Sequence, residues 1–235
     1  MKGNKVIRYL KYAFGEIILV VIGILIALQI NTWNQERLDE KEKTELLEKL
    51  HAEFKENKKA LSDYLVVEDK VIGAGIALIN LIGTTKDELN THNLDSLLSE
   101  SFPANELAFS DNAINNITQN GRLNLFKNEA IETLLYQWNS LGKIRNTRLA
   151  KLDQWNNEIF IPYLLPYVSL KQIDSNSNFV WTGKSKVKPD YYPLFQKVEF
   201  ENLLDNMLWM NHQIKQRLVE TDLLIDRILK ETAVR

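Results

Sequence analysis

The sequence predicts an all-α protein: one N-terminal transmembrane helix followed by an extracytoplasmic antiparallel helical bundle. Three observations favour this fold class. A wholly apolar run lies near the N-terminus, at residues 17–28. Beyond it, long stretches place apolar residues at intervals of three and four, the period of an amphipathic helix. Only nine glycines and five prolines occur in 235 residues, as expected where long helices dominate.

The apolar run is the candidate membrane anchor. Residues Ile17 to Leu28 read IILVVIGILIAL and contain no polar side chain. This run is shorter than the ~20 residues that cross a ~30 Å hydrocarbon core. Its flanks extend the segment to 12–33, which is long enough to span. Tyr9 and Tyr12 on one side and Trp33 on the other predict an aromatic belt, because such rings favour the headgroup region.

Two alternatives compete with a retained anchor. A cleaved signal peptide also has a basic start and an apolar run of this length. Its cleavage site needs small residues at the first and third positions before the cut, but Leu25 lies two residues before Ala27, and no suitable pair follows up to Asn34. A buried core helix is the other alternative, and uniform apolarity at the extreme N-terminus disfavours it. A retained signal anchor is therefore favoured.

The positive charges predict the orientation of the span. Segment 1–11 contains lysine and arginine but no acidic residue, whereas the cations after the span are interleaved with acidic residues. By the positive-inside rule, the N-terminus is cytoplasmic. The chain then divides into a basic cytoplasmic segment at 1–11, a signal anchor at 12–33 and an external helical domain at 34–235.

One face of the span carries an acidic group and two small residues. Helical spacing aligns Glu16, Val20, Gly23 and Ala27. An ionisable side chain within a span is costly and marks a functional site by default. The alternative, which is favoured, is that Glu16 reaches the interface and pairs with Lys11 or Tyr12. Gly23 and Ala27 form a small-xxx-small pair, which permits close helix approach in lipid. This face is the predicted transmembrane association face.

Five helices are expected in the external domain. The first continues out of the membrane through 36–82 and ends at Gly83, with Gly73 and Gly75 marking either a kink or a close helix crossing. The others are expected at about 93–100, from a cap at Ser110-Asp111 to 120, from an N-cap at Asn128 to about 160, and at 199–231.

The connection at 160–200 differs in composition from the helices. It holds four of the five prolines and many aromatic residues. Long connections of this kind often carry function. The candidate binding surface here consists of Tyr163, Tyr167, Trp181, Tyr191 and Tyr192. The alternative, which is favoured, is that these rings cover the open end of the bundle.

The residues that most enzymes and metal sites use show no recognisable pattern. The chain has no cysteine, and His51, His92 and His212 are far apart without metal-type spacing. No nucleotide-binding or nucleophile motif occurs. The net charge of −2 gives no overall attraction for nucleic acid. We therefore expect no catalytic residue, no metal, no cofactor and no nucleic-acid partner.

Residues Tyr9 to Asn34, YLKYAFGEIILVVIGILIALQINTWN, resemble the N-terminal signature of an uncharacterised bacterial family of single-span membrane proteins, catalogued as a domain of unknown function. Residues 110–126, with Gly121-Arg122-Leu123, resemble the family more loosely. The resemblance implies an anchored helical domain in a bacterial envelope. It brings no catalytic residues.

The sequence thus predicts a non-enzymatic envelope protein, anchored in the bacterial inner membrane by a single pass. Its external bundle is expected to bind a partner or to scaffold an assembly. The partners are the lipid bilayer and either a second copy or another membrane or envelope protein. Two alternatives stay open. One is a periplasmic sensory module that signals laterally through its transmembrane helix, and the other is an accessory subunit of a proton-driven complex, which rests on Glu16.

Overall fold

The computed structural model describes residues 3–102, 107–119, 121–126, 129–176 and 183–233. These residues form helices and connecting segments without a strand, so the all-α prediction is confirmed for the described part of the chain. The elements in order are α1 (Gly3–Asn80), α2 (Lys86–Leu89), α3 (Leu94–Ser101), α4 (Asn112–Gln119), the 3-10 turn η1 (Arg122–Leu125), α5 (Glu129–Trp155), the π turn η2 (Asn156–Phe160), α6 (Ile161–Leu164), α7 (Leu170–Asp174), α8 (Tyr192–Phe195) and α9 (Val198–Glu231).

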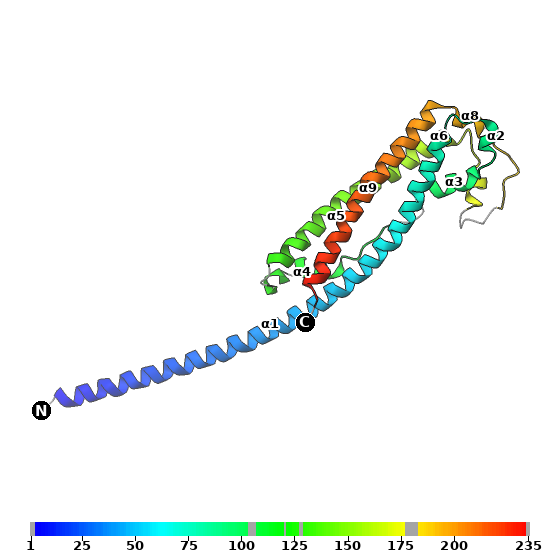
Figure 1. Cartoon of the computed structure of the whole chain (residues 1–235). Coiled ribbons are helices and arrows are strands. Elements are labelled where there is room, and N and C mark those ends of the chain that lie inside the picture. The colour runs from blue at the N-terminus through cyan, green and yellow to red at the C-terminus, as the bar shows by residue number, and fades with distance from the viewer. Residues whose placement is uncertain (1–2, 103–106, 120, 127–128, 177–182, 234–235) are drawn as a thin grey trace.

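Helix α1 runs unbroken for 78 residues, or about 117 Å at 1.5 Å per residue. Its N-terminal part projects alone from the bundle (Figure 1), and every residue from 12 to 38 is exposed. Burial begins at Leu46 and then recurs every three or four residues. This is the heptad period of helices that pack side by side. The same helix is therefore both the free arm and one wall of the bundle.

Glycines 73 and 75 do not interrupt α1. A Cβ atom on Gly75 would lie 2.7 Å from Cε of Met207 and 2.9 Å from Cδ2 of Leu208, whereas nothing lies within 4 Å of the same position at Gly73. Gly75 therefore marks a close crossing with α9. The helix ends where predicted: Gly83 has φ +75° and donates its N–H to the carbonyl of Phe195.

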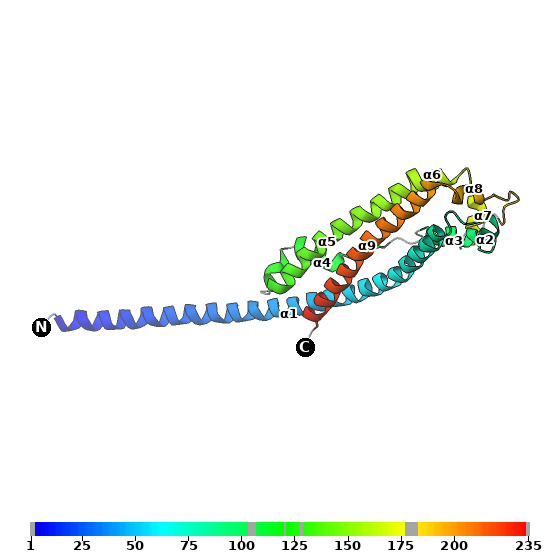
Figure 2. The same ribbon diagram turned by 45° about the horizontal axis from the view of Figure 1, so that its top comes forward.

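Helix α9 runs antiparallel to both other long helices. Against α1, Lys215 pairs with Asp69, and Lys58 pairs with Asp222 at 2.7 Å. Against α5, the N-terminal half of α9 lies beside the C-terminal half of α5 (Figures 1 and 2). Helices α1 and α5 consequently run in the same direction. Residues 107–111, which precede α4, lie against the bundle, where the backbone N–H of Ser110 donates to the side-chain oxygen of Asn57 in α1 at 2.8 Å.

The buried apolar residues form two clusters along the bundle. The cluster nearer the exposed N-terminal arm contains Phe54, Trp138 and Ile225. The distal cluster contains Phe160 and Phe195, together with residues of the short helices α2, α3, α7 and α8 that cover the far end. Buried polar residues of α1 and α9 lie between the two clusters, so the bundle has an apolar half, a polar layer and a second apolar half.

The π turn η2 corrects the register of α5. Burial at 138, 145 and 152 follows a seven-residue repeat that would next bury Ile159, but Ile159 is 49% exposed and Phe160 is fully buried. A π turn adds one residue to a helix and shifts the buried stripe by one position. The carbonyl of Asp153 accepts a hydrogen bond from the side-chain amide of Asn157 at 2.9 Å. The helix expected to end near 160 therefore continues to Leu164.

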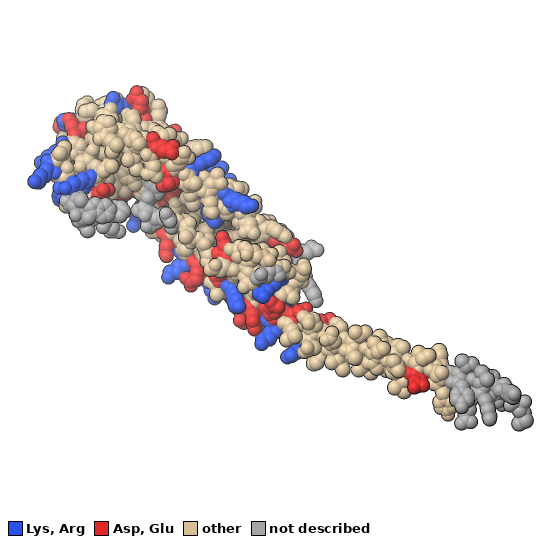
Figure 3. All heavy atoms as spheres, turned by 180° about the vertical axis from the view of Figure 1, so that it is seen from behind, with Lys and Arg blue, Asp and Glu red and all other residues tan. Residues whose placement is uncertain are grey.

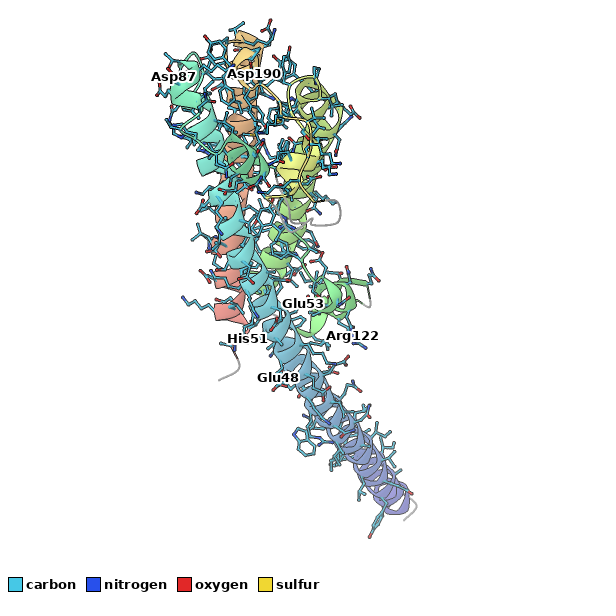
Figure 4. The ribbon with its side chains drawn as sticks, turned by 90° about the vertical axis from the view of Figure 1, so that its right-hand side faces the viewer. Glu48, His51, Glu53, Asp87, Arg122 and Asp190 are labelled. Atoms are coloured by element: carbon cyan, nitrogen blue, oxygen red, sulfur yellow. The ribbon has the colours of Figure 1, made fainter. Side chains whose placement is uncertain are left out.

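The cap of α4 comes from another helix. The carboxylate of Glu53 in α1 accepts from the backbone N–H of Ala113 at 2.9 Å and from the hydroxyl of Ser110 at 2.8 Å. Asp111 instead accepts from the indole N–H of Trp138 at 2.8 Å. Figure 4 shows Glu53 on α1 beside this short helix. Asn128, the expected cap of α5, lies outside the described residues.

Candidate functional site

The exposed arm of α1 is long and apolar enough to cross a membrane. None of the residues in its most apolar window is buried against the rest of the protein. Figure 3 shows this arm as an almost uncharged rod, whereas basic and acidic residues are spread over the bundle. Such a continuous exposed apolar surface is far larger than folded proteins normally leave in water. We therefore expect the apolar surface of this arm to be shielded from water.

The predicted association face lies on this arm. Glu16, Val20, Gly23 and Ala27 are all exposed, and nothing lies within 4 Å of a Cβ position on Gly23. The bundle does not reach these residues. The face is thus open to lipid or to another helix along its whole length.

The belt residues lie at the two ends of the arm. Tyr12 is 67% exposed and Trp33 is 64% exposed. Their separation of 21 residues corresponds to about 31 Å along the helix, close to the thickness of a hydrocarbon core. Tyr9 lies within α1, but its side chain is outside the described part of the structure.

The aromatic connection covers the far end of the bundle. Tyr163 stacks near Phe200 with ring centroids 6.5 Å apart, and also contacts Tyr167. Tyr191 donates its hydroxyl proton to Asp95, and burial raises the pKa of that hydroxyl. Tyr163, Tyr167 and Tyr191 all pack against the distal apolar cluster.

Two members of the candidate binding surface are placed differently. Tyr192 is 36% exposed at the start of α8. Trp181 lies outside the described residues. The described tyrosines therefore mainly close the core, and only Tyr192 offers an exposed ring.

A buried carboxyl lies in the polar layer. Glu68 of α1 is 2% exposed, and the hydroxyl of Tyr64 donates to its carboxylate. Burial, reinforced by the charge of Asp69, raises the pKa of Glu68 to about 7. Asn211 of α9 is also buried and donates to the carbonyl of Met207. One side-chain oxygen of Glu68 and one of Asn211 have no hydrogen-bond partner.

A buried cation lies on α5. Arg145 is 5% exposed, and its guanidinium lies over the ring of Phe109 at 4.3 Å and near that of Trp138 at 5.5 Å. Burial lowers the pKa of Arg145 to about 10, and Asp111 partly opposes this effect. Its Nε and Nη1 atoms have no hydrogen-bond partner. The cation–π contacts hold the returning segment 107–111 against α5.

An open groove lies between α5 and α9. Its volume is about 470 Å³. The walls are apolar where Ile144, Trp209 and Met210 face the groove, and the rim is basic where Lys143, Arg148 and Lys151 lie. No aspartate or glutamate is among the described residues that line it. Trp209 is 58% exposed and Ile144 is 45% exposed, so two large apolar side chains meet water there.

None of the sites predicted from the sequence includes this groove. A tryptophan on the polar side of the last helix was the available signal, and so was the spacing of cations at 143, 148 and 151. These two signals indicate a common site only when α5 and α9 are known to pack together. The described residues contain no group of three or more His, Asp or Glu side chains arranged to hold a metal ion.

Comparison with known proteins gives one match. The model of a family of unknown function (DUF6090) matches residues 16–98, which comprise most of α1, all of α2 and part of α3. This is about a third of the chain and includes most of the apolar arm. No curated protein and no solved structure matches the chain. The loosely similar segment at 110–126 lies outside the family match.

Proposed function

We propose that this chain is a non-enzymatic, membrane-anchored protein of a bacterial envelope, whose helical bundle stands outside the cytoplasm and binds a partner protein. Residues 12–33 form the single span in the inner membrane, and residues 1–11 stay in the cytoplasm. The observation that carries the proposal is the continuity of α1. One unbroken helix holds both the exposed apolar arm and the packed wall of the bundle.

Continuity fixes the geometry of the proposed protein. Among the described residues, the ion pair of Arg122 with Glu42 is the first along α1 that joins it to the bundle, and Leu46 is the first buried residue. Only about nine residues, or roughly 14 Å of helix, separate Trp33 from Glu42. The bundle therefore starts just above the headgroups and extends away from the membrane. A protein of this form presents a binding surface at a fixed height.

A topology experiment tests the proposal. A reporter that is active only outside the cytoplasm is fused to the C-terminus, and membrane retention of the full-length fusion is checked after a high-salt wash. Reporter activity with retention is the expected outcome. An inactive reporter would place the bundle in the cytoplasm and contradict the orientation. Activity in a soluble, shortened product would mean that the apolar run is cleaved.

A matched variant tests the role of the basic N-terminus. Lys2, Lys5, Arg8 and Lys11 are replaced by glutamine in the same fusion, while the acidic groups after the span are kept. Reporter activity is expected to fall, because the positive-inside bias then favours the opposite orientation. Replacement of Lys184, Lys186 and Lys188, far from the span, is the control and should leave the activity unchanged.

A further inference from the structure

The groove between α5 and α9 has the form of a docking site for one more helix. Lys143 and Lys151 are eight residues apart, so the rim extends for about 12 Å, or slightly more than two helical turns. Ile144 and Trp209 stand on opposite walls and are both about half exposed. A helix laid between two antiparallel helices inserts its apolar side chains at intervals of three and four residues.

The positive charge of the groove predicts a negatively charged occupant. Three cations line it, and no acidic residue among its described lining residues neutralises them. Lys143, Arg148 and Lys151 form no ion pair with the described part of the chain, whereas Lys58, Lys215 and Arg217 elsewhere on the bundle have carboxylate partners. A complementary helix therefore carries glutamate or aspartate on both sides of its apolar stripe.

The height of the groove excludes the lipid headgroups as the occupant. Asp69 pairs with Lys215 and Gly75 contacts Met207, so Trp209 lies level with residues 69–75 of α1. Those residues are about 36 to 42 positions beyond Trp33, or roughly 55–60 Å along the helix. A tilt of ~40° still leaves the groove roughly 40 Å from the bilayer. This distance is several Debye lengths at physiological salt.

A second copy of this chain fits the groove poorly. Copies anchored in one membrane face each other at equal height. At the level of the groove, the exposed unpaired residues of α1 include Val66, Lys70 and Ile76, which add a positive charge rather than a negative one. The α5–α9 face itself brings the same three cations. Like charges on facing surfaces disfavour association.

We propose that the α5–α9 groove binds an acidic amphipathic helix of a partner protein, which completes a fourth long helix of the bundle. The inference rests on the proposed function, because it identifies the surface and the chemistry by which the external bundle recognises its partner. Trp209 and Ile144 supply the apolar contact, and the cations at 143, 148 and 151 select acidic sequences.

A synthetic peptide tests the chemistry directly. The full-length chain is placed in nanodiscs of phosphatidylcholine and titrated with an amphipathic peptide that has leucine at each a and d heptad position and glutamate beside them. The control peptide has lysine in place of glutamate. The glutamate peptide is expected to bind and the lysine peptide is not, and added salt should weaken binding. Equal binding of both peptides, or none by either, would overturn the proposal.

Charge-reversal variants locate the bound peptide. The triple variant Lys143→Glu, Arg148→Glu, Lys151→Glu is expected to weaken binding by about tenfold or more. The control triple variant Lys184→Glu, Lys186→Glu, Lys188→Glu makes the same change in net charge on an exposed segment outside the groove. The control should bind as the unaltered protein does. Equal losses in both variants would show an unspecific charge effect and overturn the site.

Photocrosslinking tests the groove in native membranes. A benzophenone amino acid replaces Trp209 in one variant and Tyr136, which is 56% exposed on α5 outside the groove, in another. An adduct at 209 alone, mapped to an acidic helical segment of another protein, supports the proposal. An adduct with a second copy, or no adduct at 209, overturns it. Adducts at 136 alone would contradict binding in the groove. They would not contradict the proposed envelope function, which the topology reporter tests separately.

Discussion

The Nδ1 atom of His51 lies 2.9 Å from the hydroxyl oxygen of Thr232, which joins the first helix to the end of the last across 181 positions. Thr232 donates its own proton to the carbonyl of Ile228 at 2.8 Å. His51 therefore carries a proton on Nδ1 and donates to Thr232. Figure 4 shows His51 on α1 beside the end of α9. The contact closes the bundle at the end from which the exposed arm of α1 projects.

Removal of this contact should loosen the end of α9. For His51→Ala we expect faster amide hydrogen exchange in the last turns of α9, because a partly buried hydrogen bond contributes about 1 kcal/mol. His212→Ala is the control, since His212 is exposed and its side chain bonds to Gln216 on its own helix. Unchanged exchange at the end of α9 in His51→Ala would contradict the assignment.

The buried carboxyl of Glu68 should make stability depend on pH. Its pKa is raised from an ordinary value near 4.5 to about 7, so the folded state holds the proton more tightly than the unfolded state does. The stabilisation is complete below about pH 4.5 and is lost as pH rises through about 7, at a cost of about 3 kcal/mol. Glu68→Gln is therefore expected to be more stable than the native chain at pH 8.

At acid pH, the native chain and Glu68→Gln should have similar stability. At pH 4.5 the native Glu68 is protonated, and its stability should approach that of Glu68→Gln. Denaturant titrations in detergent at both pH values measure this difference. Glu56→Gln, at an exposed position of the same helix, is the control and should leave the pH profile unchanged. If the native chain is as stable as Glu68→Gln at pH 8, or more stable, the polar layer does not hold a protonated carboxyl.

The close crossing at Gly75 predicts opposite effects of one substitution at two neighbouring sites. Gly73→Leu faces open space and removes a helix-interior glycine, so it should stabilise by about 0.5–1 kcal/mol. Gly75→Leu must displace Met207 and Leu208 and should destabilise by about 1–3 kcal/mol. Thermal unfolding of both variants checks the pair, and equal melting temperatures would argue against the crossing.

The buried Arg145 predicts that a neutral residue of similar length improves stability. Arg145→Met keeps the contact with Phe109 and Trp138 but removes the cost of burying a charge, so a gain of about 1–2 kcal/mol at neutral pH is expected. Arg145→Ala leaves a cavity and should lose stability. A loss in the methionine variant as large as that in the alanine variant would show that the charge itself stabilises the fold.

The π turn predicts a tolerated deletion. Removing Asn157 converts η2 to regular α-helix and restores a seven-residue repeat from Leu152 to Phe160, so stability should change by about 1 kcal/mol or less. Removing Asn146 instead rotates the turns that bury Leu152 by 100° and should cost several kcal/mol. Circular dichroism during denaturation compares the two deletions. Similar losses would contradict the register argument.

The long helices followed from the sequence because their apolar residues repeat over many turns. Leu50, Phe54 and Leu61 of α1 belong to one such pattern, and Gly83 is a local signal that needs no partner. The one-residue shift between Leu152 and Phe160 was also present in the spacing. Its meaning required the helix to be known as continuous.

Other features depend on which surfaces meet. The shared direction of α1 and α5 depends on the return segment, which carries no helical period. The cap that Glu53 provides to Ala113 joins residues 60 positions apart, so no local pattern reveals it. Trp209 reads as one exposed aromatic residue until α5 supplies the opposite wall.

Because helix α1 is unbroken, a tilt at its N-terminal end displaces the far end of the bundle. From Trp33 to Asn80 it extends for about 70 Å without a glycine or proline below Gly73 to absorb bending. A tilt of residues 12–33 by about 10° therefore moves the far end of the bundle sideways by roughly 12 Å. In the proposed topology, a change in local lipid thickness or a neighbouring span that changes this tilt would alter which partner proteins the α5–α9 groove can reach, with no rearrangement inside the bundle.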